Sequence, residues 1–140
     1  MTPDEIRKVV NGIVLKDRRY KEDAYYFLNE AVIFSAEYFS KPEFGAGRHL
    51  SGPELLDGIR EFTLSEFGSM SLTVLKRWGL HSTLDIGHVI FNLIDAKVLA
   101  ASPEDHLGDF DSVYDFYDAF TKPFEPENEN PEPLKKIDLI

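Results

Sequence analysis

Two imidazoles and a carboxylate in one segment have the residue types and spacing of metal ligands. His81, Asp85 and His88 stand four and three residues apart, which places them on one face if the segment is helical. His81, however, precedes the residue expected to cap that helix, and no Glu-x-x-His or His-x-x-x-His pattern elsewhere would complete a ligand shell. Partial matches of this kind arise often by chance. We therefore expect no metal and no cofactor, and these three residues are the candidate ligands if a metal does bind.

Catalytic motifs are missing from the sequence. It has no cysteine, and therefore no thiol nucleophile, and it contains no Gly-x-Ser-x-Gly elbow, phosphate-binding loop or kinase signature. Carboxylates are numerous, but an acidic chain supplies possible acid–base pairs by number alone. We expect a protein without catalytic activity and assign no catalytic residue, while an enzyme or small-ligand protein with a pocket between its helical units stays an alternative.

The elements that would position these side chains are helices with clear start signals. Thr2 and Glu5, Ser51 and Glu54, and Ser82 and Asp85 have the three-residue spacing of helix-starting boxes. Apolar residues recur at helical spacing after each of them. Glycines stand where helices are expected to end. The expected helices begin near these boxes and at two further points, and cover roughly residues 2–15, 22–39, 51–67, 69–78 and 82–96.

A two-stranded ribbon is expected after the last of these helices. Residues 97–101 and 112–116 are rich in residues that favour extended structure, and a turn-forming Ser-Pro-Glu-Asp run follows the first stretch. Three helices followed by strand, turn and strand is the order of a winged helix-turn-helix. The expected fold is mainly α (α+β), with an N-terminal helical pair (residues 2–39) packed on a winged-helix-like three-helix unit with a short β-ribbon (residues 50–120).

Charge argues against the usual task of a winged helix. The chain has a formal net charge of −10, and residues 80–120 carry eight carboxylates against the single cation Lys97. Affinity for DNA rests mainly on lysine and arginine side chains that neutralise phosphates. DNA binding through the third helix of the unit is therefore not expected. The remaining route to nucleic acid is the basic segment between the first two helices, formed by Lys16, Arg18, Arg19 and Lys21.

Aromatic residues crowd the C-terminal half. Most of them are expected in the core, because one short ribbon offers little else to cover it. If several were exposed, they would form the kind of patch that binds another protein. The candidate partner-binding residues are Phe110, Tyr114, Phe116, Tyr117 and Phe120.

Several of these segments resemble one family of proteins. They are Ser51–Glu61, Trp78-Gly79, Asp85–Leu93 and the ending Tyr-Asp-Phe-x-x-Ala-Phe at residues 114–120, which is the most specific. The chain resembles, over most of residues 20–120, an uncharacterised family of short bacterial conserved hypothetical proteins, chiefly planctomycete and verrucomicrobial. The family has no assigned activity, so the resemblance implies a bacterial cytoplasmic protein and supplies no site residues.

Composition and length bound the remaining expectations. A chain of 140 residues with 43% hydrophobic residues fits one globular domain, which we place at residues 1–124. Residues 125–140 are rich in proline and glutamate and end in an apolar stretch, so a flexible tail is expected there. The acidic start is unlike a secretory signal, and no stretch is apolar enough to span a bilayer. We expect a cytoplasmic protein-interaction or oligomerisation module that uses its acidic, aromatic half; the alternative is a nucleic-acid-associated regulator using the segment around Arg18 and Arg19.

Overall fold

The computed structural model describes residues 1–39 and 50–126, and these residues are mainly helical. Within them no residue is in a β-strand, and no helix is both long enough and apolar enough to cross a membrane. The expected flexible tail lies almost wholly outside the described residues. The helices, in chain order, are α1 (Pro3–Lys16), α2 (Glu22–Tyr38), α3 (Gly52–Phe67), η2 (Gly68–Met70), α4 (Ser71–Arg77), α5 (Thr83–Asp95), η3 (Leu107–Phe110), α6 (Phe116–Phe120) and η4 (Lys122–Phe124).

The expected helix starts are confirmed by side-chain caps. The Ser51 hydroxyl accepts from the Glu54 backbone N–H at 3.2 Å, and the Glu54 carboxylate accepts from the Ser51 N–H at the same distance. Thr2 and Ser82 cap α1 and α5 through single bonds of 3.2 Å. Each cap satisfies a backbone N–H that the first helical turn leaves without a partner. The short boxes in the sequence therefore fix where these helices begin.

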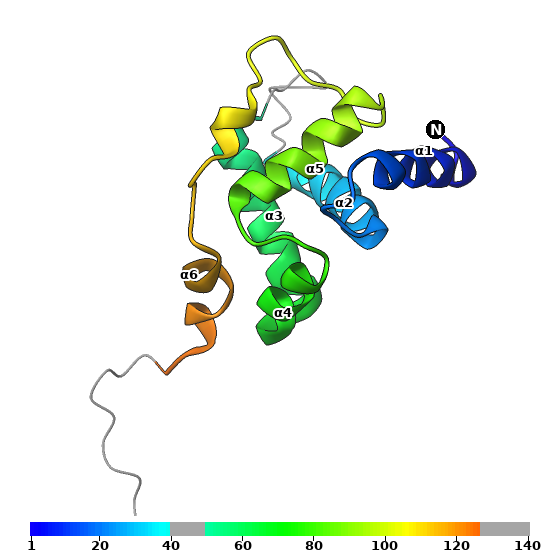
Figure 1. Cartoon of the computed structure of the whole chain (residues 1–140). Helices are drawn as coiled ribbons and strands as arrows, with labels where there is room; N and C mark the ends of the chain where they lie inside the picture. The colour runs from blue at the N-terminus through cyan, green and yellow to red at the C-terminus, as the bar shows by residue number, and fades with distance from the viewer. Residues whose placement is uncertain (40–49, 127–140) are drawn as a thin grey trace, which may run out of the picture.

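Helix α5 lies at the centre of the described chain. Its buried residues include Ile86, Val89, Ile90 and Leu93, and α2 and η3 pack against it (Figure 1). In α5, which is described throughout, Asp95 is the one residue with an exposed side chain. Helix α5 is thus mostly covered by neighbouring elements, and the expectation that it does not bind DNA stays a prediction.

The predicted β-ribbon is wrong. Lys97 has a φ of 63° and Ser112 a φ of 52°, so the first residue of each expected strand is in the left-handed region. Extended strands require strongly negative φ values. The chain instead folds back at the end of α5, where Val98 N–H donates to Leu93 C=O at 2.9 Å, and later forms the short helices η3 and α6. The β part of the expected α+β class is absent from the described residues, and without its ribbon the winged-helix-like arrangement is not confirmed.

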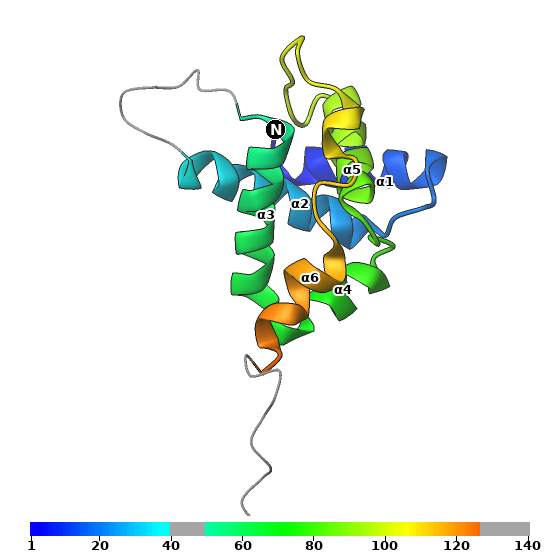
Figure 2. The ribbon, with the colours of Figure 1, turned by 90° about the vertical axis from the view of Figure 1, so that its left-hand side faces the viewer.

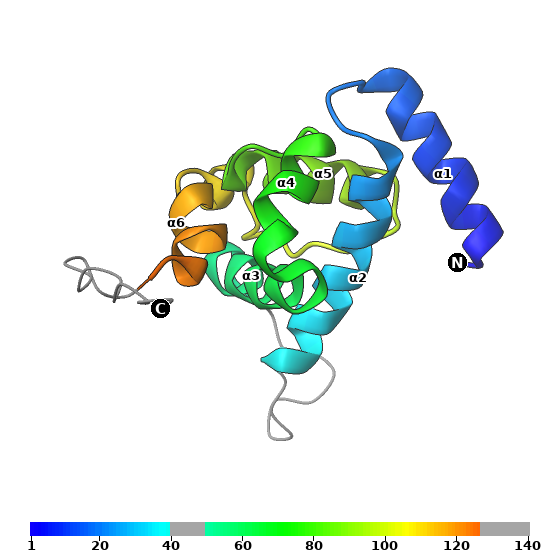
Figure 3. The same ribbon diagram turned by 90° about the horizontal axis from the view of Figure 1, so that it is seen from below.

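The first two helices differ in how deeply they are buried. Six residues of α2 are buried, and they face α3 and α5, whereas in α1 only Val10 is buried. Viewed from below, α1 stands at the edge of the molecule, beyond α2, while the other helices lie on the opposite side of α2 (Figure 3). Thus α2 belongs to the core, and α1 is an outer helix that covers part of its far face.

The C-terminal part of the described chain closes the opposite end of the core. Helix α6 is capped by Asp115, whose carboxylate accepts from the Asp118 N–H at 3.1 Å, and it lies beside α4 (Figure 2). Phe116 and Phe120, on α6, meet edge to face with ring centroids 5.2 Å apart, and both are buried. The aromatic stretch at residues 116–120 therefore forms a short helix that covers one end of the core, and not a strand.

Candidate functional site

Three of the five predicted partner-binding aromatics are buried. Phe110, Phe116 and Phe120 expose 4%, 5% and 0% of their surface, so they cannot touch a partner unless the protein unfolds locally. Phe110 packs edge to face against Phe91 on α5, with centroids 5.9 Å apart. These three side chains therefore belong to the core, and they do not form the partner-binding surface expected from the sequence.

The other two predicted aromatics differ from each other. Tyr114 is partly buried, and its hydroxyl donates to the Leu56 carbonyl at 3.0 Å, which ties the segment before α6 to α3. Tyr117 is 50% exposed, and its hydroxyl donates to Glu125. Phe124 is similarly exposed. What remains of the predicted aromatic surface is therefore this small area around α6 and η4.

The candidate metal ligands do not come together as a shell. Asp85 is engaged by the protein itself, because its two oxygens accept from the Tyr20 hydroxyl at 2.7 Å and from the His81 N–H at 2.9 Å. Across residues 1–39 and 50–126, no group of three or more histidine, cysteine, aspartate or glutamate side chains is placed to hold a metal ion. The structure thus gives Asp85 a role in holding the α1–α2 connection against the start of α5.

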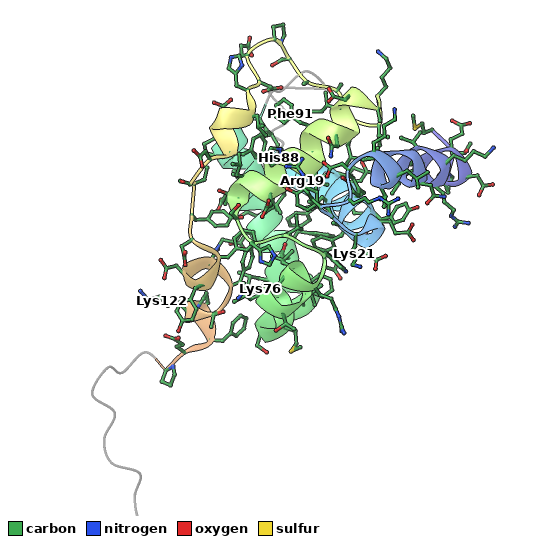
Figure 4. All side chains as sticks on the ribbon, viewed as in Figure 1. Arg19, Lys21, Lys76, His88, Phe91 and Lys122 are labelled. Carbon is green, nitrogen blue, oxygen red and sulfur yellow. The ribbon has the colours of Figure 1, made fainter. Side chains whose placement is uncertain are left out.

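The basic segment is joined in space by a second basic pair. The Lys21 N–H donates to the Trp78 carbonyl at 3.1 Å, so Lys76 and Arg77, at the end of α4, lie next to the α1–α2 connection. In Figure 4, Lys21 and Lys76 mark these two places. The sequence shows cations at residues 16–21 and at residues 76–77, but not that the two groups lie close together. Their proximity depends on a backbone hydrogen bond between distant segments.

One residue of the basic segment, Arg19, is already paired with a carboxylate of the same chain. The Arg19 guanidinium donates from Nε and Nη2 to the two oxygens of Asp17, at 2.9 and 2.7 Å. These bonds, together with the amide of Asn92, hold the pKa of Asp17 well below its usual range despite partial burial. Arg19 is therefore an exposed structural partner of Asp17. The other cations of the segment, Lys16, Arg18 and Lys21, are also exposed.

A wide hollow lies between α1 and α2 in the described part of the chain. It has a volume of about 690 Å³, and α1 forms one wall while the outward face of α2 forms the other. Its apolar part comes from Ile6 and Tyr26, both half-buried. The residues that line it are Pro3, Ile6, Arg7 and Asn11 of α1 and Glu22, Tyr26, Asn29 and Glu30 of α2. We call it the α1–α2 groove.

The groove carries opposite charges that do not pair. Arg7 projects from α1, and Glu22 and Glu30 project from α2, yet within the described chain none of the three forms an ion pair. All three are exposed. Together with the side-chain amides of Asn11 and Asn29, they give the groove both hydrogen-bond donors and acceptors along an apolar floor.

Apolar surface continues beyond the groove. Ile33 follows Tyr26 by seven residues, two helical turns, so it lies on the same outward face of α2, and it is 53% exposed. At the other end of α1, Leu15 is 69% exposed. Single exposed apolar residues are ordinary, but these two flank a hollow that is itself partly apolar.

A second hollow, smaller and more apolar, lies between α2, α3 and α5. It has a volume of about 240 Å³, and its walls include Val32, Leu55 and Phe91. Its carboxylates, Asp105 and Asp109, accept backbone N–H groups of Ser102 and His106 at 2.7 and 3.1 Å. The space is below the usual size of a ligand site, and its polar groups hold local turns rather than converge on a ligand position. This hollow therefore gives no specific support to the enzyme or small-ligand alternative.

Comparisons with protein-family models, curated proteins and solved structures found no match to this chain. The resemblance to the family of short bacterial proteins, and the cytoplasmic location it implies, accordingly stay predictions. Any function proposed for this chain therefore rests on the surfaces of its own structure.

Proposed function

We propose that this chain is a non-catalytic protein-interaction module, and that the α1–α2 groove receives a helical segment of another chain. The observation that carries the proposal is the combination of an apolar floor with unpaired charges of both signs in one hollow of about 690 Å³. An amphipathic helix laid into such a groove buries its apolar face and sets its charged residues against the rim.

The buried surface of α1 supports the same proposal. Ile6, Val9, Ile13 and Val14 form its apolar stripe, yet all four are only partly buried. Burial of apolar side chains is the main source of helix stability in water, because an isolated helix of this length is marginal. A partner in the groove would cover Ile6, which lines it and which α2 alone leaves partly exposed.

This proposal moves the expected surface from one half of the chain to the other. The expectation of an interaction module built on the acidic, aromatic C-terminal half rested on side chains that prove to be buried, above all Phe116 and Phe120. The groove, in contrast, is formed by helices from the nearly neutral N-terminal half. The class of function is retained, and its location is new.

Photo-crosslinking in the cell of origin tests the proposal. A photoreactive phenylalanine analogue at position 29, inside the groove, should give a discrete covalent adduct with a protein. The matched control carries the analogue at position 65, an exposed site on α3. Adduct at position 29 and not at 65 is expected, and its loss in the Tyr26→Ala background would tie it to the groove floor. Equal labelling at both positions, or none at 29, would overturn the proposal.

The nucleic-acid alternative has one observation in its favour. The bond between Lys21 and Trp78 adds Lys76 and Arg77 to the exposed cations near Arg18, so the basic area is larger than either sequence cluster. Glu22 and Asp23 lie beside it, and the whole chain is at −10, which weakens attraction to phosphates.

Gel-shift measurements at increasing salt test this second candidate. Binding of duplex or single-stranded nucleic acid should weaken with salt and should weaken further in the Arg18→Ala and Lys76→Ala variants, because each loses one phosphate contact. Arg19 is a poor choice for this test, since its removal would also free Asp17. No shift at low salt would eliminate the candidate.

A further inference from the structure

The charges of the first two helices suggest which chain fills the groove. Every charged residue of α2 is acidic: Glu22, Asp23, Glu30 and Glu37. Helix α1 carries the cations Arg7, Lys8 and Lys16. Its first turn also carries the acids Asp4 and Glu5, so three cations stand against two carboxylates. Two α2 faces would therefore repel each other, whereas α1 of one molecule and α2 of another are electrostatically complementary.

Resting on the proposed function of the groove, we infer that its occupant is α1 of a second copy of this chain. In a two-fold dimer each α1 lies in the groove of the other molecule, so the four helices form a bundle. Arg7 of each copy is then set against Glu30 of the other. An isologous contact of this kind satisfies both unpaired charges at once, which a monomer leaves open.

Exposed apolar residues at the margins of the groove fit the same arrangement. Leu15 is 69% exposed near the end of α1, and Ile33 is 53% exposed on the outward face of α2. An antiparallel pairing of hairpins would place such margins against the second copy. The apolar contribution to the dimer thus comes from residues that the monomer does not cover.

Exchange of α1 between the copies is disfavoured by the way the connection is held. Tyr20 is only 2% exposed, its hydroxyl donates to Asp85, and Asp17 accepts from Asn92 on α5. A domain swap would have to break these contacts. Each α1 therefore stays on its own α2, and the second copy adds to the pair.

The area of the face formed by α1 and α2 determines how tight a dimer we expect. Helix α1 has 14 residues. It is therefore about 21 Å long, and two packed helices are about 20 Å across, which gives about 400 Å² of flat face for each copy. The two copies together would bury about 800 Å², less than the roughly 1,200 Å² at which standard specific interfaces begin, so the contact belongs with weak, transient interfaces. We expect a reversible dimer with a dissociation constant in the micromolar range, visible as a concentration-dependent mass.

Sedimentation equilibrium with charge-reversal variants is the experiment. The purified wild-type chain should pass from monomer to dimer with rising concentration. Arg7→Glu and Glu30→Arg should each weaken the dimer by about tenfold or more, because each sets like charges against each other. Arg77→Glu, an exposed change on α4, is the control and should leave the constant unchanged, and circular dichroism should show that all variants are folded.

Mixing the two variants gives the decisive outcome. In each single variant, positions 7 and 30 of the same molecule carry like charges. Only pairing between molecules brings Glu at 7 against Arg at 30, and Arg at 7 against Glu at 30. An equimolar mixture should therefore regain the wild-type dimer constant. A mixture that stays monomeric, or a wild-type dimer that neither reversal affects, would overturn the inference.

The fate of the proposed function can be told apart from that of the inference. If the wild-type chain is monomeric at every concentration, the second copy is not the occupant. Should position 29 still crosslink to a different protein under that result, the groove is an interaction site for that protein and only the self-association fails. Loss of both results would remove the groove as a binding surface.

Discussion

The side-chain amide of Asn92 donates to the Asp17 carboxylate at 3.0 Å, across 75 residues of sequence. The same amide nitrogen donates to the hydroxyl of the buried Tyr25, also at 3.0 Å. Asn92 on α5 thereby joins the α1–α2 connection to α2. It acts together with the Tyr20–Asp85 and Lys21–Trp78 hydrogen bonds, which also hold the α1–α2 connection to the core.

Replacing Asn92 with leucine should therefore destabilise the protein. The change leaves the Tyr25 hydroxyl and one Asp17 oxygen without their amide donor, and we expect a loss of about 1–3 kcal/mol in the free energy of unfolding. Urea unfolding followed by circular dichroism measures it. Asp95→Asn, an exposed change on the same helix, is the control and should cost little. Equal stability of the two variants would contradict the role given to Asn92.

Asp17 should make stability depend on acid pH. Hydrogen bonds from Arg19 lower the pKa of Asp17 below its ordinary value of 3.8, so the folded state favours the ionised carboxylate. The associated stability is present above that value and is lost as the pH falls below about 4 towards the lower pKa of the folded state. Asp17→Asn should show a shallower loss of unfolding free energy between about pH 5 and pH 2. Identical acid profiles for variant and wild type would rule this out.

Tyr114 should have the opposite effect at alkaline pH. Burial raises the pKa of the Tyr114 hydroxyl above its ordinary value of 10.0, so the folded state favours the protonated form. The associated stability is complete below about pH 10 and declines as the pH rises further. Tyr114→Phe should cost about 1 kcal/mol at neutral pH through the lost bond to Leu56 and should reduce the alkaline decline. A decline that is as steep in the variant would show that Tyr114 is not responsible.

Replacement by alanine should change the stability of the protein in opposite directions at Gly58 and at Gly12. A Cβ at Gly58 would lie 2.3 Å from Ser35 Oγ and 3.0 Å from Ser35 Cα, where α3 crosses α2, whereas a Cβ at Gly12 would meet nothing within 4 Å. Gly58→Ala should therefore destabilise by about 1–3 kcal/mol through overpacking. Gly12→Ala should stabilise by up to about 1 kcal/mol, because alanine favours the helix. Thermal unfolding of both variants checks the pair, and a change of the same sign in each would argue against this crossing.

Local signals made the helices predictable, and tertiary contacts made the C-terminal half unpredictable. Ser51 and Ser82 cap helices as their spacing indicates, because a cap involves neighbouring residues only. The expected strands failed because Lys97 and Ser112 adopt left-handed backbone angles that no propensity scale assigns to them. The cap of α6 at Asp115 had a signal in the sequence, since Asp118 follows three residues later, but the aromatic pattern favoured a strand.

The candidate site was harder to predict than the fold. Burial of Phe116 and Phe120 depends on α6 packing beside α4, which sequence periodicity over five residues cannot reveal. The groove did leave a trace, because Tyr26 and Ile33 are apolar residues on a face of α2 otherwise rich in glutamate. That trace becomes interpretable only once α1 is seen on the same face.

The most direct test of the account is a dilution series followed by nuclear magnetic resonance of the side-chain amides. Asn11 and Asn29 line the α1–α2 groove, and Asn92 is a matched amide inside the molecule. As the concentration rises from micromolar to millimolar, dimerisation through the groove should shift the Asn11 and Asn29 resonances progressively. The Asn92 resonance should stay fixed. Shifts confined to residues around Tyr117 and Phe124, with Asn11 and Asn29 unchanged, would contradict it.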